Sequence, residues 1–180
     1  MGFALVGLVL APTPAGAALP QQGPCTTSNS NIRPAKVHFA GLGSAYGVIP
    51  VRRKRNGTIG TPPVNTAGKH LVGWDRYTMP GEGTGTVILD AHTWPDGSAL
   101  GNAMLRQMHA GQLIVVSNGD GAKVCYQITQ RRSYRAHRIP RRKAFRPWGP
   151  EQLVVVVCSG KRVGPGKWLR RTIWWATPVS

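Results

Sequence analysis

The chain consists of short runs of apolar and β-branched residues separated by glycine- and proline-rich turns. Turn-forming groups such as Asn56-Gly57, Pro80-Gly81 and Gly164-Pro165-Gly166 divide the runs. Short runs rich in Val, Ile, Thr and Tyr are typical of β-strands. The pattern predicts strands at Ala35–Phe39, Gly47–Val51, Thr84–Ala91, Gln112–Ser117, Lys123–Thr129, Gln152–Cys158 and Arg171–Ala176.

Helical periodicity is clear over one stretch, Ser98–Met108. The segment "QLIVVSNGDGAKVCYQIT" places two predicted strands around a glycine-rich turn and therefore predicts a hairpin. The run "EQLVVVVCSG" is continuously apolar, as expected for a strand buried on both faces, and Cys158 lies where that strand is expected to end. Many short strands with little helix favour an all-β (mainly β) fold, a closed or partly closed barrel.

The expected domain organisation has three parts. A length of 180 residues suits one domain with an apolar core. Residues 1–18 join a short apolar stretch to a small-residue site, Ala15-Gly16-Ala17, and indicate a signal-like or truncated anchor segment, with a disordered tail as the alternative. Residues 19–34 have the composition of a flexible linker, and residues 35–180 are expected to form the folded domain. This organisation predicts export.

The charge of the chain is strongly unbalanced, with 23 Lys and Arg against 6 Asp and Glu and a net charge of +17. So few, scattered carboxylates argue against mechanisms that use paired acids or an acidic metal cage. The densest cationic segment, "QRRSYRAHRIPRRKAFRPW", is interpreted as a loop. The excess of cations predicts an anionic partner. Because export is expected, anionic envelope polymers or lipid head groups are favoured over nucleic acid.

Three cysteines leave at least one thiol unpaired within the chain, and an odd thiol in an exported protein is a candidate reactive group. Cys158 is the candidate nucleophile because a side chain at the end of a rigid strand can face a cleft. Cys25 lies in the expected linker and Cys125 in the middle of a strand. The cysteines lack the spacing of metal ligands, which argues against a zinc site. Inert core packing is the alternative role for Cys158.

His92 is the histidine whose position best suits catalysis. It lies between the strand-forming "TVILDA" and the turn-rich "TWPDGSALGN", also at a junction of strand and loop. A nearby base or cation favours the reactive thiolate form of a cysteine. The cation would be Arg170 or Arg171, and strand alternation places these two arginines on opposite faces. Alternation alone leaves the choice between them open.

Three segments in chain order, "GTVILDAHTWPDGSALGNAM", "LVVVVCSG" and "WLRRTIWWAT", resemble the histidine, cysteine and arginine segments of sortases, which are cysteine transpeptidases. The upstream segment "GVIPVRRKRNGTIGTPPVNTAGKHLVGWDR" is similar to that of actinobacterial class F sortases. The resemblance extends from about Ala35 to Thr177. Val157 departs from the family pattern, since a threonine often precedes the cysteine.

The resemblance implies a sortase-like closed β-barrel of about eight strands with one or two short helices. It implies catalytic roles for His92, Cys158 and Arg171, because Arg171 fits the family pattern of Arg, any residue, then Ile or Val. It implies no cofactor and no metal. The cationic loop before the cysteine strand also argues against the calcium activation of some family members.

The implied reaction is cleavage of an LPXTG-like C-terminal sorting signal on an exported protein through a thioester on Cys158. An amine of peptidoglycan or of a pilin would then release the protein and attach it to the cell wall or the pilus. The implied location is the extracytoplasmic face of the cell envelope, with a membrane anchor in a longer amino-terminal region left open.

Two other interpretations are kept. An L,D-transpeptidase also acts on peptidoglycan through a cysteine, but Cys158 follows four valines where that family has a Ser-His-Gly-Cys cluster. A basic β-barrel that binds polyanions without catalysis explains the charge. It does not explain the order of the histidine, cysteine and arginine segments.

Overall fold

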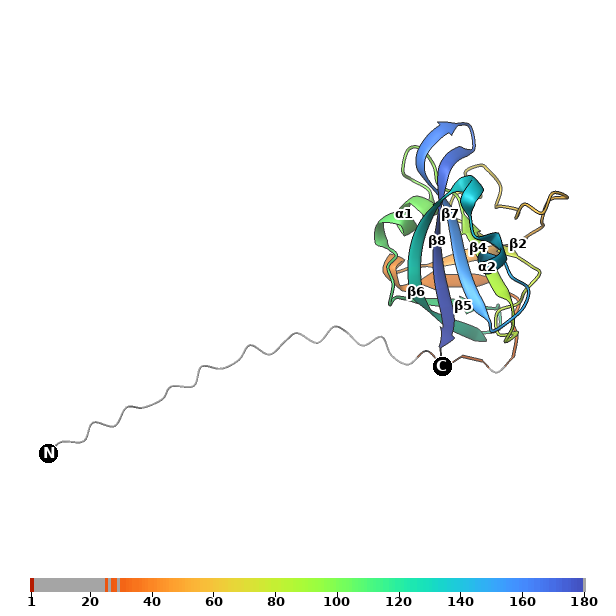
Figure 1. Cartoon of the computed structure of the whole chain (residues 1–180). Helices are drawn as coiled ribbons and strands as arrows, with labels where there is room; N and C mark the ends of the chain where they lie inside the picture. Colours follow the sequence, from red (N-terminus) through yellow and green to blue (C-terminus); the bar gives the residue numbers. More distant parts are fainter. Residues whose placement is uncertain (2–24, 26, 29, 180) are drawn as a thin grey trace.

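The computed structural model describes residues 1, 25, 27–28 and 30–179. Apart from residue 1, the expected signal-like segment 1–18 lies outside the described residues. The described residues form a closed barrel of eight strands in the order β1-β2-β3-β4-β7-β8-β6-β5 (Figure 1). This confirms the predicted mainly-β closed barrel of about eight strands. Two short α-helices and two 3-10 turns accompany the strands.

The bounds of the elements are as follows. The strands are β1 (Lys36–Phe39), β2 (Ala45–Val51), β3 (Val72–Asp75), β4 (Thr86–Ala91), β5 (Leu113–Ser117), β6 (Lys123–Arg135), β7 (Gln152–Gly164) and β8 (Lys167–Val179). The helical elements are η1 (Ala40–Leu42), α1 (Leu100–Gln107), η2 (Ala136–Arg138) and α2 (Arg141–Ala144). No helix among the described residues is long and apolar enough to cross a membrane.

Strand pairing fixes which residues lie side by side. The β2–β3 and β4–β7 pairs are parallel, and the other pairs are antiparallel. The pairing of β1 with β5 closes the barrel. The predicted hairpin over 112–129 is confirmed as β5 and β6. The parallel pair β4–β7 brings the predicted histidine and cysteine segments together in the middle of the sheet.

Alternation along the central strands supplies two apolar layers. Inward side chains such as Leu89, Val155 and Trp174 fill the barrel, together with residues of α1. Outward side chains, including Ile88 and Ile173, form a second cluster against α2 and the chain around it. Both faces of β4 and β7 are therefore covered where they pair. This explains why the sequence of β7 is a continuous apolar run rather than an alternating one.

The structure corrects several predicted boundaries. The four-residue strand β3 is absent from the prediction because it is too short to show a period. Strand β7 does not end at Cys158 but continues to Gly164, and β7 and β8 form a hairpin that extends beyond the barrel (Figure 1). The predicted cationic loop is partly strand, because β6 extends to Arg135 and pairs with β8.

The described part of the expected linker 19–34 is attached to the barrel. Cys25 forms a disulfide with Cys125 of β6. The Thr27 hydroxyl donates to the carbonyl oxygen of Val179 at 2.6 Å. The side chain of Ile32 is buried in the core cluster. Over these residues the structure differs from a flexible linker, because a disulfide and a buried side chain fix what composition alone indicates as mobile.

We predict that loss of the Cys25–Cys125 disulfide destabilises the protein without abolishing the fold. The disulfide spans a sequence separation of 100 residues, and cross-links of this kind stabilise by about 2–4 kcal/mol. The double variant C25S/C125S should therefore melt about 5–15 °C lower than the wild type. Thermal unfolding measured by circular dichroism tests this. Equal melting temperatures would contradict a stabilising role for the disulfide.

Candidate active site

Cys158 and Arg171 lie on the neighbouring strands β7 and β8, and His92 directly follows the end of β4, on the other side of β7. The last partners of the β4–β7 pair are Ala91 and Val157, and His92 and Cys158 are the next residues along these two segments. In the β7–β8 pair Cys158 lies directly opposite Arg171. Neighbouring strands are about 5 Å apart. The histidine, cysteine and arginine positions therefore form one row at the end of the barrel from which the hairpin extends.

All three side chains line one groove on the outer face of these strands, with a volume of about 520 Å³. Its floor includes Ile88 and Val156, and its walls come from the β2–β3 loop on one side and the η2–α2 region on the other. The groove lining is mostly apolar, and its polar residues include Asp90, His92 and Arg171. Such a shape suits an extended peptide or a ligand of similar size.

Main-chain and hydroxyl contacts fix the His92 segment. The ring Nε2 of His92 lies 2.7 Å from the carbonyl oxygen of Pro62. Because a carbonyl only accepts, Nε2 is the protonated nitrogen in this contact, and Nδ1 is left to exchange a proton. The Thr93 hydroxyl donates to the carbonyl oxygen of Cys158 at 2.7 Å. This bond ties the residue after the histidine to the strand that carries the thiol.

Pro62 and Thr93 are site residues that the sequence reasoning missed. The Pro62 contact uses a main-chain carbonyl, so no side-chain pattern could indicate it. Thr93 directly follows the candidate histidine, and its hydroxyl could have been considered for that reason. Its contact to Cys158 depends on the β4–β7 register, which is not visible in the sequence.

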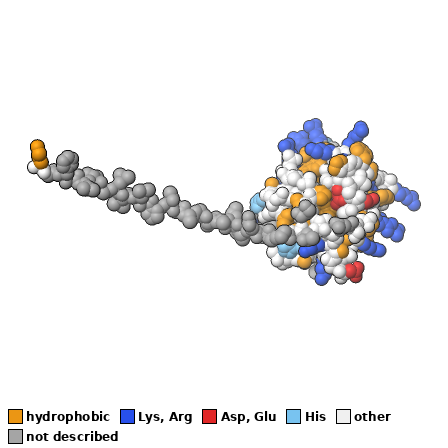
Figure 2. All heavy atoms as spheres, turned by 90° about the horizontal axis from the view of Figure 1, so that it is seen from below, with side chains coloured by type: hydrophobic (Ala, Val, Ile, Leu, Met, Phe, Trp, Pro, Cys, Tyr) orange, Lys and Arg blue, Asp and Glu red, His pale blue; other side chains and the backbone are white. Residues whose placement is uncertain are grey.

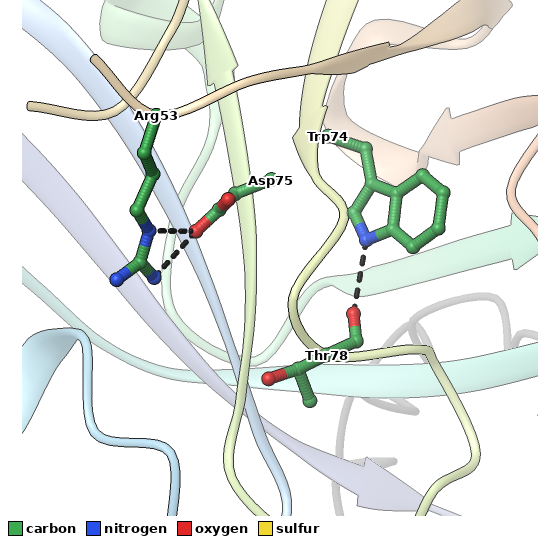
Figure 3. A network of polar contacts seen from close by, with 4 residues as sticks. All are labelled: Arg53, Trp74, Asp75 and Thr78. Atoms are coloured by element: carbon green, nitrogen blue, oxygen red, sulfur yellow. Dashed lines mark hydrogen bonds and ion pairs between the residues drawn. The ribbon is translucent and has the colours of Figure 1, made fainter. Parts of the chain in front are cut away.

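An ion pair at the start of the β2–β3 loop fixes the loop that carries Pro62. Arg53 donates to one carboxylate oxygen of Asp75 from Nε at 2.8 Å and from Nη2 at 2.5 Å (Figure 3). Asp75 is only 1% exposed, which limits solvent screening of this pair. The indole of Trp74, the residue before Asp75, donates to the carbonyl oxygen of Thr78 at 3.0 Å (Figure 3). Both contacts hold β3 and its flanking loops in place.

The structure separates the two candidate arginines. Arg171 lines the groove and donates from Nη1 to the carbonyl oxygens of Trp168, at 3.1 Å, and of Arg170, at 2.8 Å. Arg170 points elsewhere and donates to the side chain and the carbonyl oxygen of Ser133, both at 2.8 Å. The alternation seen in the sequence therefore holds. Of the two, Arg171 is the one that shares the groove with Cys158.

The groups around Cys158 shift the pKa of its thiol in opposite directions. Burial raises the pKa of the thiol, the Arg171 guanidinium lowers it, and Asp90 raises it when its carboxyl group is ionised. The net effect is a pKa above the ordinary thiol value, so the resting side chain is the neutral thiol at neutral pH. A base that removes the thiol proton is therefore needed for reaction, and His92 is the neighbouring candidate.

The other sequence candidates do not join this site. Cys25 and Cys125 form the disulfide, so Cys158 is the free cysteine among the described residues. His109 follows the end of α1, and His137 lies in η2. Within the described part of the chain, no cluster of three or more His, Cys, Asp or Glu side chains could hold a metal ion.

The cationic segment 131–146 lies beside the groove. Arg141 lines the groove, and Arg131 stacks over Trp174 at 5.3 Å. Among the described residues, one ion pair is present, Arg53–Asp75, so almost all cations lack an acidic partner. Lys and Arg side chains project around the edge of the molecule in the view of Figure 2. The surface therefore carries a largely uncompensated positive charge.

Comparisons with known proteins identify the fold. No protein-family model matches the chain, and no curated protein matches its sequence. Among solved structures, it is similar to sortase C1 of Streptococcus agalactiae in complex with MTSET, with a TM-score of 0.57, 13% identity and coverage of 81% of this chain and 69% of that one. It is also similar to sortase C1 of Streptococcus suis, with a TM-score of 0.57, 13% identity and coverage of 82% and 73%.

A third similar structure is sortase A of Corynebacterium diphtheriae, with a TM-score of 0.59 and 14% identity. The match covers 84% of this chain and 62% of that protein. At these identities the similarity establishes the architecture: the barrel has the sortase fold. The roles of individual residues have to be argued from the geometry of this groove.

We predict that Arg171, and not Arg170, promotes ionisation of Cys158. Removing a neighbouring cation disfavours the thiolate, so R171Q should raise the thiol pKa further and slow alkylation by iodoacetamide several-fold near pH 8. R170Q is the matched control, because Arg170 contacts Ser133 outside the groove. The pH dependence of the alkylation rate measures the effect. Equal shifts in both variants would contradict the assignment.

Proposed function

We propose that the protein is a sortase-type cysteine transpeptidase. The observation that carries the proposal is that His92, after the end of β4, and Cys158 and Arg171, on adjacent strands, line one mostly apolar groove. A thiol, a base and a fixed cation beside a peptide-sized groove are the components that acyl transfer through a thioester requires. The sortase fold and the order of the three sequence segments support the same reaction.

The first half-reaction forms the thioester. As Cys158 attacks the carbonyl carbon after the threonine of the sorting signal, its thiol proton passes to His92. The bond between sulfur and carbon forms, and the peptide C–N bond breaks. The imidazolium of His92 returns the proton to the departing amine. The raised thiol pKa makes this transfer necessary, because little thiolate exists before substrate binds.

The second half-reaction releases the acyl group to an amine. Neutral His92 accepts a proton from the incoming primary amine as its nitrogen attacks the thioester carbon. The C–S bond breaks, and the sulfur recovers a proton. If water takes the place of the amine, the same steps give hydrolysis. The contact of His92 Nε2 with Pro62 favours Nδ1 as the nitrogen that exchanges these protons.

Arg171 stabilises the negative charge that develops on the substrate. Two of its contacts are to main-chain carbonyls, which hold the guanidinium at the groove without neutralising it. A fixed donor aimed at an oxyanion in a sheltered site contributes a few kcal/mol to transition-state stabilisation. The same group can also hold the peptide backbone in register with Cys158.

The finer assignment follows the sequence resemblance. We propose an LPXTG-like C-terminal signal on exported proteins as first substrate and an amine of peptidoglycan or of a pilin as second substrate. We propose class F as the nearest group of sortases and the extracytoplasmic face of the cell envelope as the location. The cationic surface beside the groove would attract anionic envelope polymers. That attraction would concentrate the enzyme near its acceptor.

Activity on a fluorogenic LPXTG peptide tests the proposed reaction. C158A should reduce cleavage to background, and H92A should reduce kcat/KM by about 10²–10⁴-fold, because proton transfer is lost. R171Q should lose about 10²-fold, whereas R170Q should stay within about twofold of the wild type. C158A and H92A variants that remain as active as the wild type would refute the mechanism.

Association with anionic cell-wall fragments should depend on salt. Exposed cations in the segment 131–146 are screened as ionic strength rises, so the bound fraction should fall steeply between about 50 and 500 mM salt. Cosedimentation measures it. The triple variant R141Q/R142Q/K143Q should bind more weakly than the charge-matched control R52Q/K54Q/R55Q. Salt-independent association would contradict an electrostatic origin.

A further inference from the structure

Asp90 is an unpartnered acid in the groove. Its side chain is only 8% exposed, it lines the groove, and its buried Oδ1 has no hydrogen-bond partner. The carboxyl groups of the other acids, all of them described, each accept at least one hydrogen bond: Asp75, Glu82, Asp96, Asp120 and Glu151. A buried polar atom left without a partner costs stability and is a frequent mark of a functional site.

The local backbone makes room for this carboxyl group. Asp90 on β4 lies directly opposite Gly73 on β3. A Cβ atom at residue 73 would lie 2.2 Å from Asp90 Oδ1, so the absence of a side chain there admits the carboxyl group. The same position is close to the Cδ atom of Pro62, whose carbonyl contacts His92. Asp90 therefore lies on the floor of the groove, under the β2–β3 loop.

The charged groups around Asp90 do not compensate it. Asp75 on β3 is itself negative and is occupied by Arg53. His92 follows the end of β4, the strand that carries Asp90. The other titratable groups that line the groove are Cys158 and Arg162 of β7, Arg171 of β8 and Arg141 of α2, and none of them forms an ion pair or hydrogen bond with Asp90. Arg171 is held by main-chain carbonyls. Burial and the charge of Asp75 both raise the pKa of Asp90, which favours the neutral acid.

A peptide in this groove needs side-chain partners for its amides. The main-chain groups of β4 are engaged on both sides, with β3 and with β7, so the peptide cannot add as a further strand there. The floor beside Asp90 is apolar, formed by Ile88 and Val156. Burying an amide against such a surface without a hydrogen bond is costly. A neutral carboxylic acid offers one donor and one acceptor in the same place.

We propose that Asp90 is a specificity-determining residue that binds a backbone amide of the peptide substrate, donating a hydrogen bond from its neutral carboxyl group to the peptide carbonyl oxygen. This inference rests on the proposed function in that the occupant of the groove is a peptide. Oδ1 is fully buried beside Gly73, so the oxygen that meets the peptide is Oδ2. This role also explains why an uncompensated acid is kept beside the nucleophile in a chain with few acids.

The test compares two reagents that alkylate Cys158. A peptidyl chloromethyl ketone with an LPXT-type sequence must occupy the groove, whereas iodoacetamide reports the reactivity of the thiol alone. The ratio of the two second-order rate constants therefore isolates peptide recognition from changes in thiol pKa. D90N keeps a neutral donor and acceptor of the same shape, and D90L keeps the size without polarity. D120N, on the β5–β6 turn, is the matched control.

We expect the rate ratio of D90N and D120N to stay within about twofold of the wild type and that of D90L to fall about tenfold, the loss of one hydrogen bond. As pH rises and Asp90 ionises, the ratio should fall in the wild type but not in D90N. D90L should melt no lower than the wild type, since an unsatisfied buried carboxyl group is removed.

A rate ratio in D90N as low as that in D90L would overturn the proposal, because a neutral donor and acceptor of the same shape would then not support peptide binding. A D90L ratio equal to that of the wild type would also overturn it, while leaving the transpeptidase proposal standing. A wild-type protein that shows no preference for the peptidyl reagent would refute both the peptide groove and the role of Asp90. The three outcomes are thus distinguishable.

Discussion

The register across β4, β7 and β8 is the constraint on which the site depends. His92, Cys158 and Arg171 come from distant parts of the sequence, and hydrogen-bonded ladders place them in one row. The ladder is rigid because both faces of β4 and β7 are packed where they pair, one in the barrel and one against the α2 region. A shift of one residue would turn a side chain to the opposite face. The packing of β4 and β7 therefore fixes which side chains face the groove.

Two opposing effects set the pKa of the Cys158 thiol. Burial keeps Cys158 as a thiol at rest, and Arg171 opposes this effect without overcoming it. In the proposed mechanism, such a thiol needs an aligned base to attack a bound peptide. The ordered contacts of His92 with Pro62 and of Thr93 with Cys158 supply the alignment.

Much of the fold could be predicted from the sequence, because apolar runs and turn residues mark seven of the eight strands. The sequence pattern does not predict strand β3, because Val72–Asp75 is too short to show a hydrophobic period. The ends of β6, β7 and β8 were placed too early, because polar residues there continue as strand through pairing between segments distant in sequence. Because of this pairing, Cys158 lies within strand β7 and not at the start of a loop.

The positions of the site residues were also accessible from the sequence, whereas their contacts were not. Strand alternation separated Arg171 from Arg170 by face, but only the register with β7 shows which of them meets Cys158. The Pro62 carbonyl and the orphaned oxygen of Asp90 depend on how the β2–β3 loop folds over β4. Such contacts are tertiary, and no local pattern encodes them.

Mass spectrometry of the protein after incubation with LPXTG-type peptides tests the central claim most directly. The account predicts an adduct equal to the acyl part of the peptide, up to and including its threonine, located on Cys158 and released by hydroxylamine or a primary amine. The adduct should be missing in C158A. Cleavage of the peptide without any acyl adduct on Cys158, or an adduct on another residue, would contradict thioester formation at this site.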